Sequence, residues 1–193
     1  MGPDQILQHF RDTNALLDGH FILSSGLHSP LYLQCALALQ YPADASRFAR
    51  LIAQNFDRSD IDTVASPAIG GLIIGYAVAA AMNVRFIWTE RQNGEMTLRR
   101  GFGIRRNERV LVVEDVITTG GSTRECISVI EANGGSVVSA ASIVDRSNGK
   151  ADVGVYRMSL LSLDVPSYTA ADCPLCERGD VAVKPGSRAN ISN

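Results

Sequence analysis

The sequence predicts an α/β protein whose doubly wound, mostly parallel sheet is flanked by helices, and three observations support that fold class. From about residue 60 onward, short apolar runs alternate with segments of helical character. The runs are apolar throughout, as is typical of strands that are buried on both faces. The helix expected before the last of these strands ends at Gly134-Gly135, the residue type that commonly terminates helices.

The N-terminal part is expected to contain two helices with a hairpin-like segment between them. Apolar residues recur at helical spacing over residues 3–17. Residues 19–35 mix Gly, Ser and Pro with β-favouring residues, so a hairpin or an irregular strand region is expected there. The Tyr41-Pro42 pair breaks the chain, and helical spacing returns over residues 43–56.

The remaining elements form the predicted sheet and its crossover helices. Strands are expected at 61–65, 84–88, 110–113 and 137–144, helices at 71–82 and 121–133, and a further apolar run covers 158–165. Residues 89–108 are polar and have little periodicity. Because so long a connection is unusual in a compact domain, we expect it to act as a functional lid.

Composition excludes several classes of protein. The 193 residues include 46% apolar side chains, which is enough for one globular domain and far from the disordered regime. The formal net charge is −2, and the chain has 16 Arg but only two Lys, with six of the Arg between Arg91 and Arg109. A nucleic-acid-binding domain would be broadly basic, so we expect no nucleic-acid partner and favour a small anionic ligand.

Neither secretion nor a membrane is expected. The opening Met-Gly-Pro-Asp lacks a basic segment followed by an apolar one, as a secretory signal would have. The longest uncharged stretch, 66–83, contains three Gly and a Pro, which fits a buried turn and helix better than a membrane span. Four scattered Cys do not form a disulfide framework, so a cytoplasmic location is expected.

The segment 110–123 carries the strongest chemical signal. Four apolar residues are followed by Glu114 and Asp115, and then by a loop rich in Thr, Gly and Ser that leads into a helix. A helix N-terminus of this kind presents free N–H groups that suit a phosphate. The carboxylates would repel a phosphate, so they are expected to bind sugar hydroxyls or water on Mg²⁺. A capped helix behind two solvated acids is the plainer alternative.

This segment resembles the phosphoribosyl diphosphate (PRPP) signature of the type I phosphoribosyltransferases. The resemblance implies their fold, with a small N-terminal hood over the sheet. It also implies that Glu114 and Asp115 hold the ribose hydroxyls and that the following loop wraps the 5′-phosphate. The PRPP-binding residues expected on this basis are Glu114, Asp115, Val116, Ile117, Thr118, Thr119, Gly120, Gly121 and Ser122, joined by Ala68, Ile69, Gly70, Gly71 and Arg91.

Three further segments resemble the orotate branch of this family. Residues 21–32 are similar to the hood segment over the pyrimidine, 66–71 to the loop that cradles the diphosphate, and 143–146 to the strand whose last Arg faces orotate. The orotate-binding residues implied are Thr118, Arg146, Ser24, Ser25 and Tyr32. Arg146 can form a forked contact with a carboxylate, although a surface ion pair with Asp145 is the alternative.

The resemblance implies an activity and a division of the chain. The activity is transfer of ribose 5-phosphate from PRPP to orotate, giving orotidine 5′-monophosphate and diphosphate on the route to UMP. The expected parts are an N-terminal helix and hood (1–40), a core (41–170) with its lid at 89–103, and a C-terminal tail (171–193). Mg²⁺ is expected on PRPP, with water near Glu114 and Asp115 rather than direct protein ligands. The lid implies a homodimer with shared active sites.

The chain also departs from the family pattern. Many members have Lys where this chain has Ser24 and Gly70, and Lys and His inside the lid. Arg91 matches the lid arginine, and the catalytic group is expected to comprise Arg91, Arg99, Arg100 and Asp115. Either Arg99 or Arg100 replaces the missing Lys, or Mg²⁺ and backbone amides stabilise the charge. Another nucleobase, or a non-catalytic PRPP-sensing regulator, remains the alternative function.

Two smaller features stay open. Cys173-Pro-Leu-Cys176 offers half of the four ligands that a structural zinc requires, and two copies could complete a site if the tails of a dimer met. A redox role or plain tail structure are the alternatives. His20 and His28 flank the hood; His28 could reach substrate, but histidines in such turns are usually structural.

Overall fold

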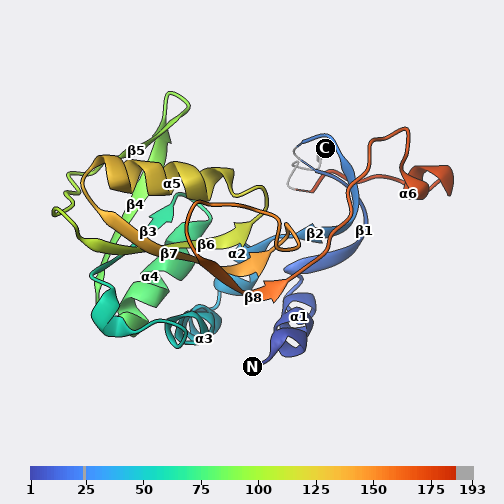
Figure 1. Ribbon diagram of the computed structural model, residues 1–193. Coiled ribbons are helices and arrows are strands. Elements are labelled where there is room, and N and C mark those ends of the chain that lie inside the picture. The colour runs from blue at the N-terminus through green and yellow to red at the C-terminus, as the bar shows by residue number, and fades with distance from the viewer. Residues whose placement is uncertain (24, 186–193) are drawn as a thin grey trace, which may run out of the picture.

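A single six-stranded sheet organises the protein in the computed structural model, which describes residues 1–23 and 25–185 (Figure 1). Its strands follow the order β5-β4-β3-β6-β7-β8. They comprise β3 (Thr63–Pro67), β4 (Arg85–Gln92), β5 (Glu95–Leu98), β6 (Arg109–Ile117), β7 (Ser136–Asp145) and β8 (Arg157–Ser162). All neighbouring pairs are parallel except β4 and β5, so the mostly parallel sheet is confirmed.

Helices cover both faces of the sheet. Helices α3 (Pro42–Ala53) and α4 (Gly71–Met82) lie on one face, and α5 (Gly121–Ala132) lies on the other (Figure 1). Residues of β6 alternate between the two cores: Leu111 and Val113 pack with α3 and α4, whereas Val110 and Val112 pack with α5. This alternation explains why β6 is apolar at every position here, as strands buried on both faces are.

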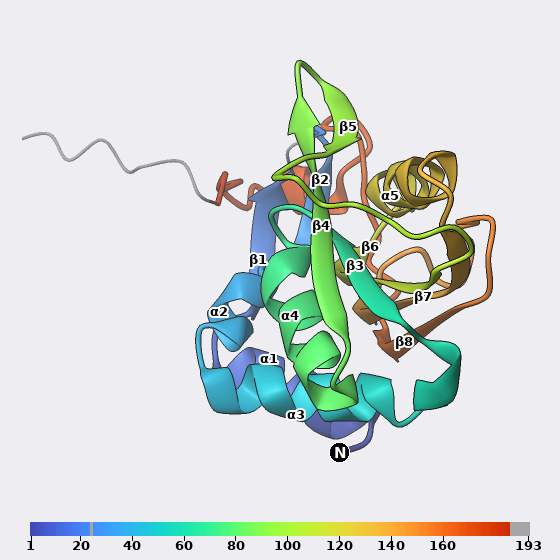
Figure 2. The same ribbon diagram turned by 90° about the vertical axis from the view of Figure 1, so that its left-hand side faces the viewer.

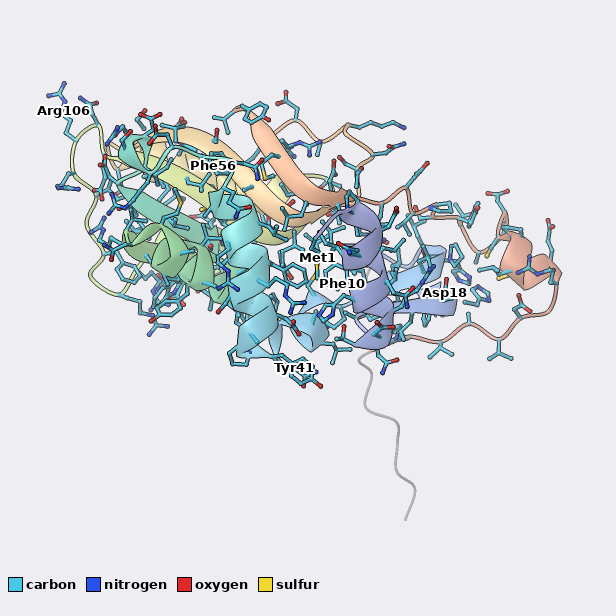
Figure 3. The ribbon with its side chains drawn as sticks, turned by 90° about the horizontal axis from the view of Figure 1, so that it is seen from below. Met1, Phe10, Asp18, Tyr41, Phe56 and Arg106 are labelled. Atoms are coloured by element: carbon cyan, nitrogen blue, oxygen red, sulfur yellow. The ribbon has the colours of Figure 1, made fainter. Side chains whose placement is uncertain are left out.

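The N-terminal segment forms the hood beside the sheet. It consists of α1 (Pro3–Asp12), the antiparallel hairpin of β1 (Leu16–Ile22) and β2 (His28–Leu33), and the short α2 (Cys35–Leu39). The hairpin expected at 19–35 is confirmed, but the helix expected to reach residue 17 ends at Asp12. Asn14 adopts a left-handed conformation with φ of 55°, and the chain then enters β1. Phe10 of α1, labelled in Figure 3, lies on the side of α1 that faces α3. It packs against Phe48 at a ring separation of 5.7 Å.

The region expected to be an irregular lid is a β-hairpin. Strand β4 continues to Gln92 and pairs with β5, so that the hairpin projects beyond the sheet (Figure 2). Asn93 and Gly94 connect the strands with φ values of 53° and 90°. Two successive positive φ values are typical of the Asn-Gly turn that joins tight hairpins. The Asn-Gly pair was therefore a hairpin signal that the low periodicity of the surrounding residues obscured.

The C-terminal segment returns to the hood after β8. Tyr168 pairs with His28 of β2, and Val183 pairs with Phe21 of β1. Between them lies the single-turn helix α6 (Pro174–Glu177), which Figure 1 shows beside the hairpin. A short 3₁₀ turn, Arg58–Asp60, precedes β3. Among the helices of the described residues, none is long and apolar enough to cross a membrane.

Candidate active site

The polar loops that the sequence singles out meet at one edge of the sheet. They follow the carboxyl ends of β3, β6 and β7, which are adjacent parallel strands. In open α/β sheets this edge is where ligands bind. The hood lies against the same edge, so the site is bounded by the sheet, the loops and the β1–β2 hairpin.

Glu114 and Asp115 lie within the last part of β6 and are both half-buried. Burial raises the pKa of Glu114 to about 7, the charge of Asp115 adds to the rise, and a hydrogen bond from the Thr123 hydroxyl opposes it. Burial also raises the pKa of Asp115, against the effect of the Val116 N–H. The strand was expected to stop at residue 113, but it runs to Ile117 and fixes both carboxylates on a rigid element.

The loop after β3 comes directly against Asp115. A Cβ atom added to Gly70 would lie 2.6 Å from Asp115 Oδ1, closer than any side chain could be without a shift. A side chain at position 70 would therefore require the Asp115 carboxylate to shift. Ile69 is 85% exposed, and Ala68 donates its N–H to the Thr89 carbonyl. The backbone of this loop is thus held in place next to the carboxylates.

The loop after β6 leads into the N-terminus of α5. Gly120 takes a φ of 75°, which a side chain would disfavour, and Thr118 and Thr119 are exposed. Arg124 donates to the Thr119 carbonyl at 3.0 Å and so fixes the loop. Free N–H groups at this helix start suit a phosphate. The side chain of Ile117 is fully buried in the sheet, so the backbone is the part of that residue that can meet a ligand.

A cavity of about 620 Å³ separates this edge from the hood. Four residues expected to bind orotate line it together: Ser25, Tyr32, Thr118 and Arg146. Tyr32 is held by a ring contact with Phe21 at 5.7 Å. Ser24, the fifth, lies outside the described residues. The structure thus brings together residues that are more than 100 positions apart in the sequence.

In the part of the chain that the structure describes, Arg146 is one of two cationic residues that line this cavity, the other being Lys184. Its guanidinium is partly buried, and burial lowers its pKa. Within the described residues, its Nε is buried without a hydrogen-bond partner. The surface ion pair with Asp145 does not form, because Asp145 binds Arg157 at 2.9 Å and accepts hydrogen bonds from Ser147 and Gly149. A buried cation without a partner is costly, so the site favours an anionic ligand.

The lid arginines are not part of this cavity. Arg91 contacts Glu125 of α5 at 2.5 Å, while Arg100 forms two hydrogen bonds with Glu90, at 2.8 and 3.0 Å. Arg99 lies 3.6 Å from the same Glu90. All three arginines are on or just beyond the projecting β4–β5 hairpin (Figure 2). Their expected catalytic role is therefore a prediction that depends on movement of the hairpin or on a second chain.

Sequence reasoning missed the contribution of the C-terminal segment. Val165, Ser167, Lys184 and Pro185 line the same cavity, although none of them was among the residues expected in the site. The signal was weak, because no motif marks these residues. Only the isolated strand pairings of the tail with the hood show why they reach the cavity.

Comparison with known proteins agrees with this geometry. The model of the phosphoribosyl transferase domain matches residues 39–170. An orotate phosphoribosyltransferase of Caldicellulosiruptor bescii is 52% identical over 188 residues, covering 97% of this chain and 99% of that protein. One from Thermotoga maritima is 49% identical over 176 residues, covering 91% and 94%. The crystal structure of orotate phosphoribosyltransferase from Aeropyrum pernix has a TM-score of 0.67 at 27% identity, covering 82% of this chain and 93% of that chain.

The chain therefore belongs to the phosphoribosyltransferase family, and its fold is the type I fold of that family. Within the family it is one of the orotate phosphoribosyltransferases, which are pentosyltransferase enzymes. The resemblance stated from residues 110–123 and from the hood is confirmed.

Proposed function

We propose that the cavity between the hood and the sheet is where this enzyme transfers ribose 5-phosphate from PRPP to orotate, giving orotidine 5′-monophosphate and diphosphate for UMP synthesis. The main observation behind the proposal is the position of Arg146. Its partly buried guanidinium faces the cavity next to Thr118, at the start of the phosphate-type loop. Orotate is a planar pyrimidine with a carboxylate, the group that a guanidinium binds through two parallel hydrogen bonds.

PRPP is assigned to the loops beside that cavity. Backbone N–H groups of 118–122 would hold its 5′-phosphate, and Glu114 and Asp115 would accept hydrogen bonds from its ribose hydroxyls. The loop at 68–71 would hold the diphosphate. The Gly70–Asp115 contact supports this order, because it places the diphosphate loop next to the ribose-binding acid. A sugar between two phosphate-binding loops matches the layout of PRPP.

The acids also fit Mg²⁺. PRPP and water would supply the six oxygen ligands that Mg²⁺ prefers, and water would link the ion to Glu114 and Asp115. When bound, Mg²⁺ would neutralise charge on the diphosphate. The raised pKa of Glu114 supports this assignment, since a nearby cation would restore its ionised form.

Charge on the departing diphosphate is what the protein has to stabilise. Orotate has a nucleophilic nitrogen already, so a strong general base is not required. The N–H groups of 68–71 would face the leaving group, and Arg91 with Arg99 or Arg100 would approach when the hairpin closes. The Arg91–Glu125 pair is about half exposed and is therefore a weak contact that closure can break. Closure would also exclude water from the sugar cation.

A homodimer would place the hairpin of one chain at the site of the other. Helix α4 and strand β4 expose an apolar groove of about 330 Å³ lined by Leu72, Ile73, Tyr76, Phe86 and Trp88. Tyr76 is 66% exposed and Ile73 47%. An exposed apolar face beside the hairpin supports a second copy of the chain as its partner. The four cysteines are free thiols, which supports a reducing cytoplasm as the location.

An absorbance assay of orotate consumption tests the proposal. Wild-type protein with PRPP and Mg²⁺ should consume orotate, and adenine, hypoxanthine or uracil should not replace it. Activity with one of these bases instead would assign a different phosphoribosyltransferase reaction. PRPP binding without product from any base would instead support a non-catalytic PRPP sensor.

A mixture of two variants with lowered activity tests the shared site. Arg91→Ala and Asp115→Asn chains should regain activity when mixed, because one of the two sites in a mixed dimer would combine an intact lid with an intact PRPP loop. Failure to regain activity in a mixture shown to exchange subunits would contradict the shared site.

A further inference from the structure

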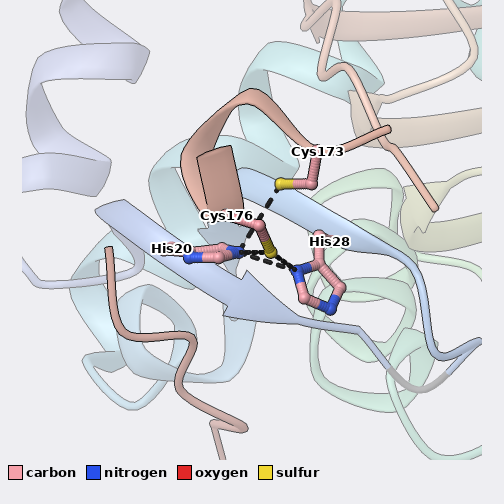
Figure 4. Close-up of side chains that lie close together, drawn as sticks. All are labelled: His20, His28, Cys173 and Cys176. Carbon is pink, nitrogen blue, oxygen red and sulfur yellow. Dashed lines mark hydrogen bonds between the residues drawn. The ribbon is translucent and has the colours of Figure 1, made fainter. Parts of the chain in front are cut away.

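Two histidines of the hood and two cysteines of the tail converge on one point. His20 lies on β1, His28 on β2, and Cys173 and Cys176 at the start of α6 (Figure 4). One ligand atom from each residue can be chosen so that all four lie within 4.8 Å of one another. Within the described residues, this is the one cluster of three or more His, Cys, Asp or Glu side chains placed for a metal ion.

The distances match a tetrahedral site. His28 Nδ1 lies 2.7 Å from His20 Nε2 and 3.3 Å from Cys176 Sγ. His20 Nε2 lies 3.6 Å from Cys173 Sγ and 3.8 Å from Cys176 Sγ. With ordinary zinc–nitrogen and zinc–sulfur bonds, a tetrahedral site has ligand separations of about 3.3–3.8 Å. Of these four separations, only the one between the two nitrogens would have to widen to admit an ion.

Hydrogen bonding already prepares His20 as a ligand. Its Nδ1 lies 2.9 Å from the Asp180 carbonyl oxygen, which can only accept, so Nδ1 carries the proton. Its Nε2 lone pair then points into the cluster. Metal-bound histidines are typically oriented by such a bond from the other ring nitrogen. His20 and His28 are 6% and 8% exposed, Cys173 is fully buried and Cys176 is partly exposed. A bound ion would therefore be shielded from water on the side of the first three ligands.

We propose that His20, His28, Cys173 and Cys176 bind one structural Zn²⁺ per chain. A Cys₂His₂ set is typical of closed zinc sites, and four protein ligands leave no position for substrate. The second pair of ligands for the Cys173–Cys176 motif thus comes from the hood of the same chain, not from the tail of a partner. The zinc ion at this site would take no part in the transfer reaction itself.

The ion would fasten the tail to the hood. Few backbone hydrogen bonds join the tail to the hairpin among the described residues. His28 and Tyr168 exchange two, the Val183 N–H donates to the His20 carbonyl, and the Ile22 N–H donates to the Val183 carbonyl. The same tail supplies Val165 and Ser167 to the wall of the orotate cavity. A zinc at this junction would therefore keep one wall of the cavity in place from outside the site.

Metal content measured directly tests the proposal. Protein made without a polyhistidine tag or chelators should contain about one Zn²⁺ per chain by plasma mass spectrometry, and Co²⁺ substitution should give the intense visible bands of a tetrahedral thiolate site. The Cys173→Ser/Cys176→Ser double variant and His28→Ala should lose both signals. Cys126→Ala and His9→Asn, which remove a cysteine and the third histidine outside the cluster, should retain them.

Several results would overturn the proposal. They are wild-type protein that binds neither Zn²⁺ nor Co²⁺, a Cys173–Cys176 disulfide in protein kept under reducing conditions, and zinc retained by the double variant. Should the variants not fold, trypsin digestion of wild-type protein gives a second measure: chelator treatment should speed cleavage at Arg178 at least tenfold, and added Zn²⁺ should reverse it. Equal cleavage rates would count against the site. None of these measurements depends on which base the enzyme uses.

Discussion

Acidic side chains lie at both ends of strand β6: Glu108, directly before the strand, is buried, whereas Glu114 and Asp115 in its last part are half-buried. Their surroundings shift their pKa values in opposite directions. At the start, Glu108 accepts hydrogen bonds from the Thr63 hydroxyl and the Arg105 N–H and contacts Arg85 at 3.0 Å. Burial alone would raise its pKa, but these partners lower it. At the far end, burial dominates and raises the pKa of both Glu114 and Asp115. Within residues 1–23 and 25–185, neither of these two forms an ion pair with an arginine.

This difference in pKa indicates that Glu108 stabilises the fold, whereas Glu114 and Asp115 serve the active site. Glu108 joins β3, β4 and the loop before β6, so its charge is fully compensated inside the fold. Glu114 and Asp115 lack a cation, and the arrangement costs stability until a ligand arrives. Buried groups with raised pKa values at a sheet edge are typical of functional sites. Substitutions at the two ends should therefore have opposite effects.

The largest effect is expected for Asp115→Asn. The variant keeps the shape of the side chain but loses the charge that would hold the ribose hydroxyls. We expect kcat/KM to fall about 1,000-fold, the equivalent of two charged hydrogen bonds, while the melting temperature stays the same or rises. Steady-state orotate consumption and thermal unfolding measure the two effects. An unchanged kcat/KM would show that Asp115 does not bind the substrate.

Glu108→Ala tests the other end. It would leave the Thr63 hydroxyl and the Arg105 N–H without their acceptor in a buried place, so the free energy of unfolding should fall by about 3 kcal/mol. Urea unfolding measures this loss, and kcat of the folded enzyme should not change. Glu95→Ala removes an exposed acid and is the matched control. If Glu108→Ala lost activity but no stability, the proposed difference between the two ends of β6 would be wrong.

Arg146→Met should weaken the use of orotate but not the binding of PRPP. Loss of the forked contact should lower kcat/KM for orotate about 100-fold, whereas PRPP binding measured by calorimetry should be nearly unchanged. Removing a partly buried cation without a partner should not destabilise the protein. Arg106→Met is the control, because Arg106 is exposed and lies far from the hood (Figure 3). Equal weakening for both substrates would argue against an orotate contact.

The smallest activity effect is expected for the lid. Arg91→Ala breaks a half-exposed ion pair, so stability should change by less than about 1 kcal/mol. The rate should nevertheless fall, by about tenfold, if Arg91 meets the leaving diphosphate only after closure. A control, Arg47→Ala, removes another exposed arginine and should leave the rate unchanged. A loss of stability without a loss of rate would show that Arg91 serves the hairpin instead.

The sequence predicted the parts of this protein that follow from periodicity and local motifs. Buried strands, crossover helices and the acid–loop–helix unit at 110–123 are encoded in consecutive residues. The hairpin at 89–98 was missed because its turn signal, Asn93-Gly94, lies among residues without strand periodicity. The cavity wall at Val165 and Ser167 depends on how the tail returns to the hood. Long-range pairing of that kind leaves no local pattern.

The zinc ligands show the same limit in a sharper form. The Cys173–Cys176 spacing was visible, but its partners lie 153 and 148 residues away on the hairpin. The spacing of a Cys-x-x-Cys motif indicates only two of the four ligands of such a site. The other half follows only from the strand pairing of tail and hood.

The contrast between the two ends of β6 is tested most directly by the unfolding free energy of Glu114→Gln against pH. In the folded protein without ligand, the pKa of Glu114 is about 7, above its ordinary value of 4.5. Between these values the folded state keeps a proton that the unfolded state releases, so this group makes the wild type less stable as pH rises.

Glu114→Gln removes that dependence. At pH 8 the variant should be more stable than wild type by about 3 kcal/mol, at pH 4 the two should be equal, and kcat/KM should be lower in the variant. Glu131→Gln, an exposed control, should show neither change. A variant that is less stable at pH 8, or equally active, would contradict the account that Glu114 is kept at a cost in stability for its role in the site.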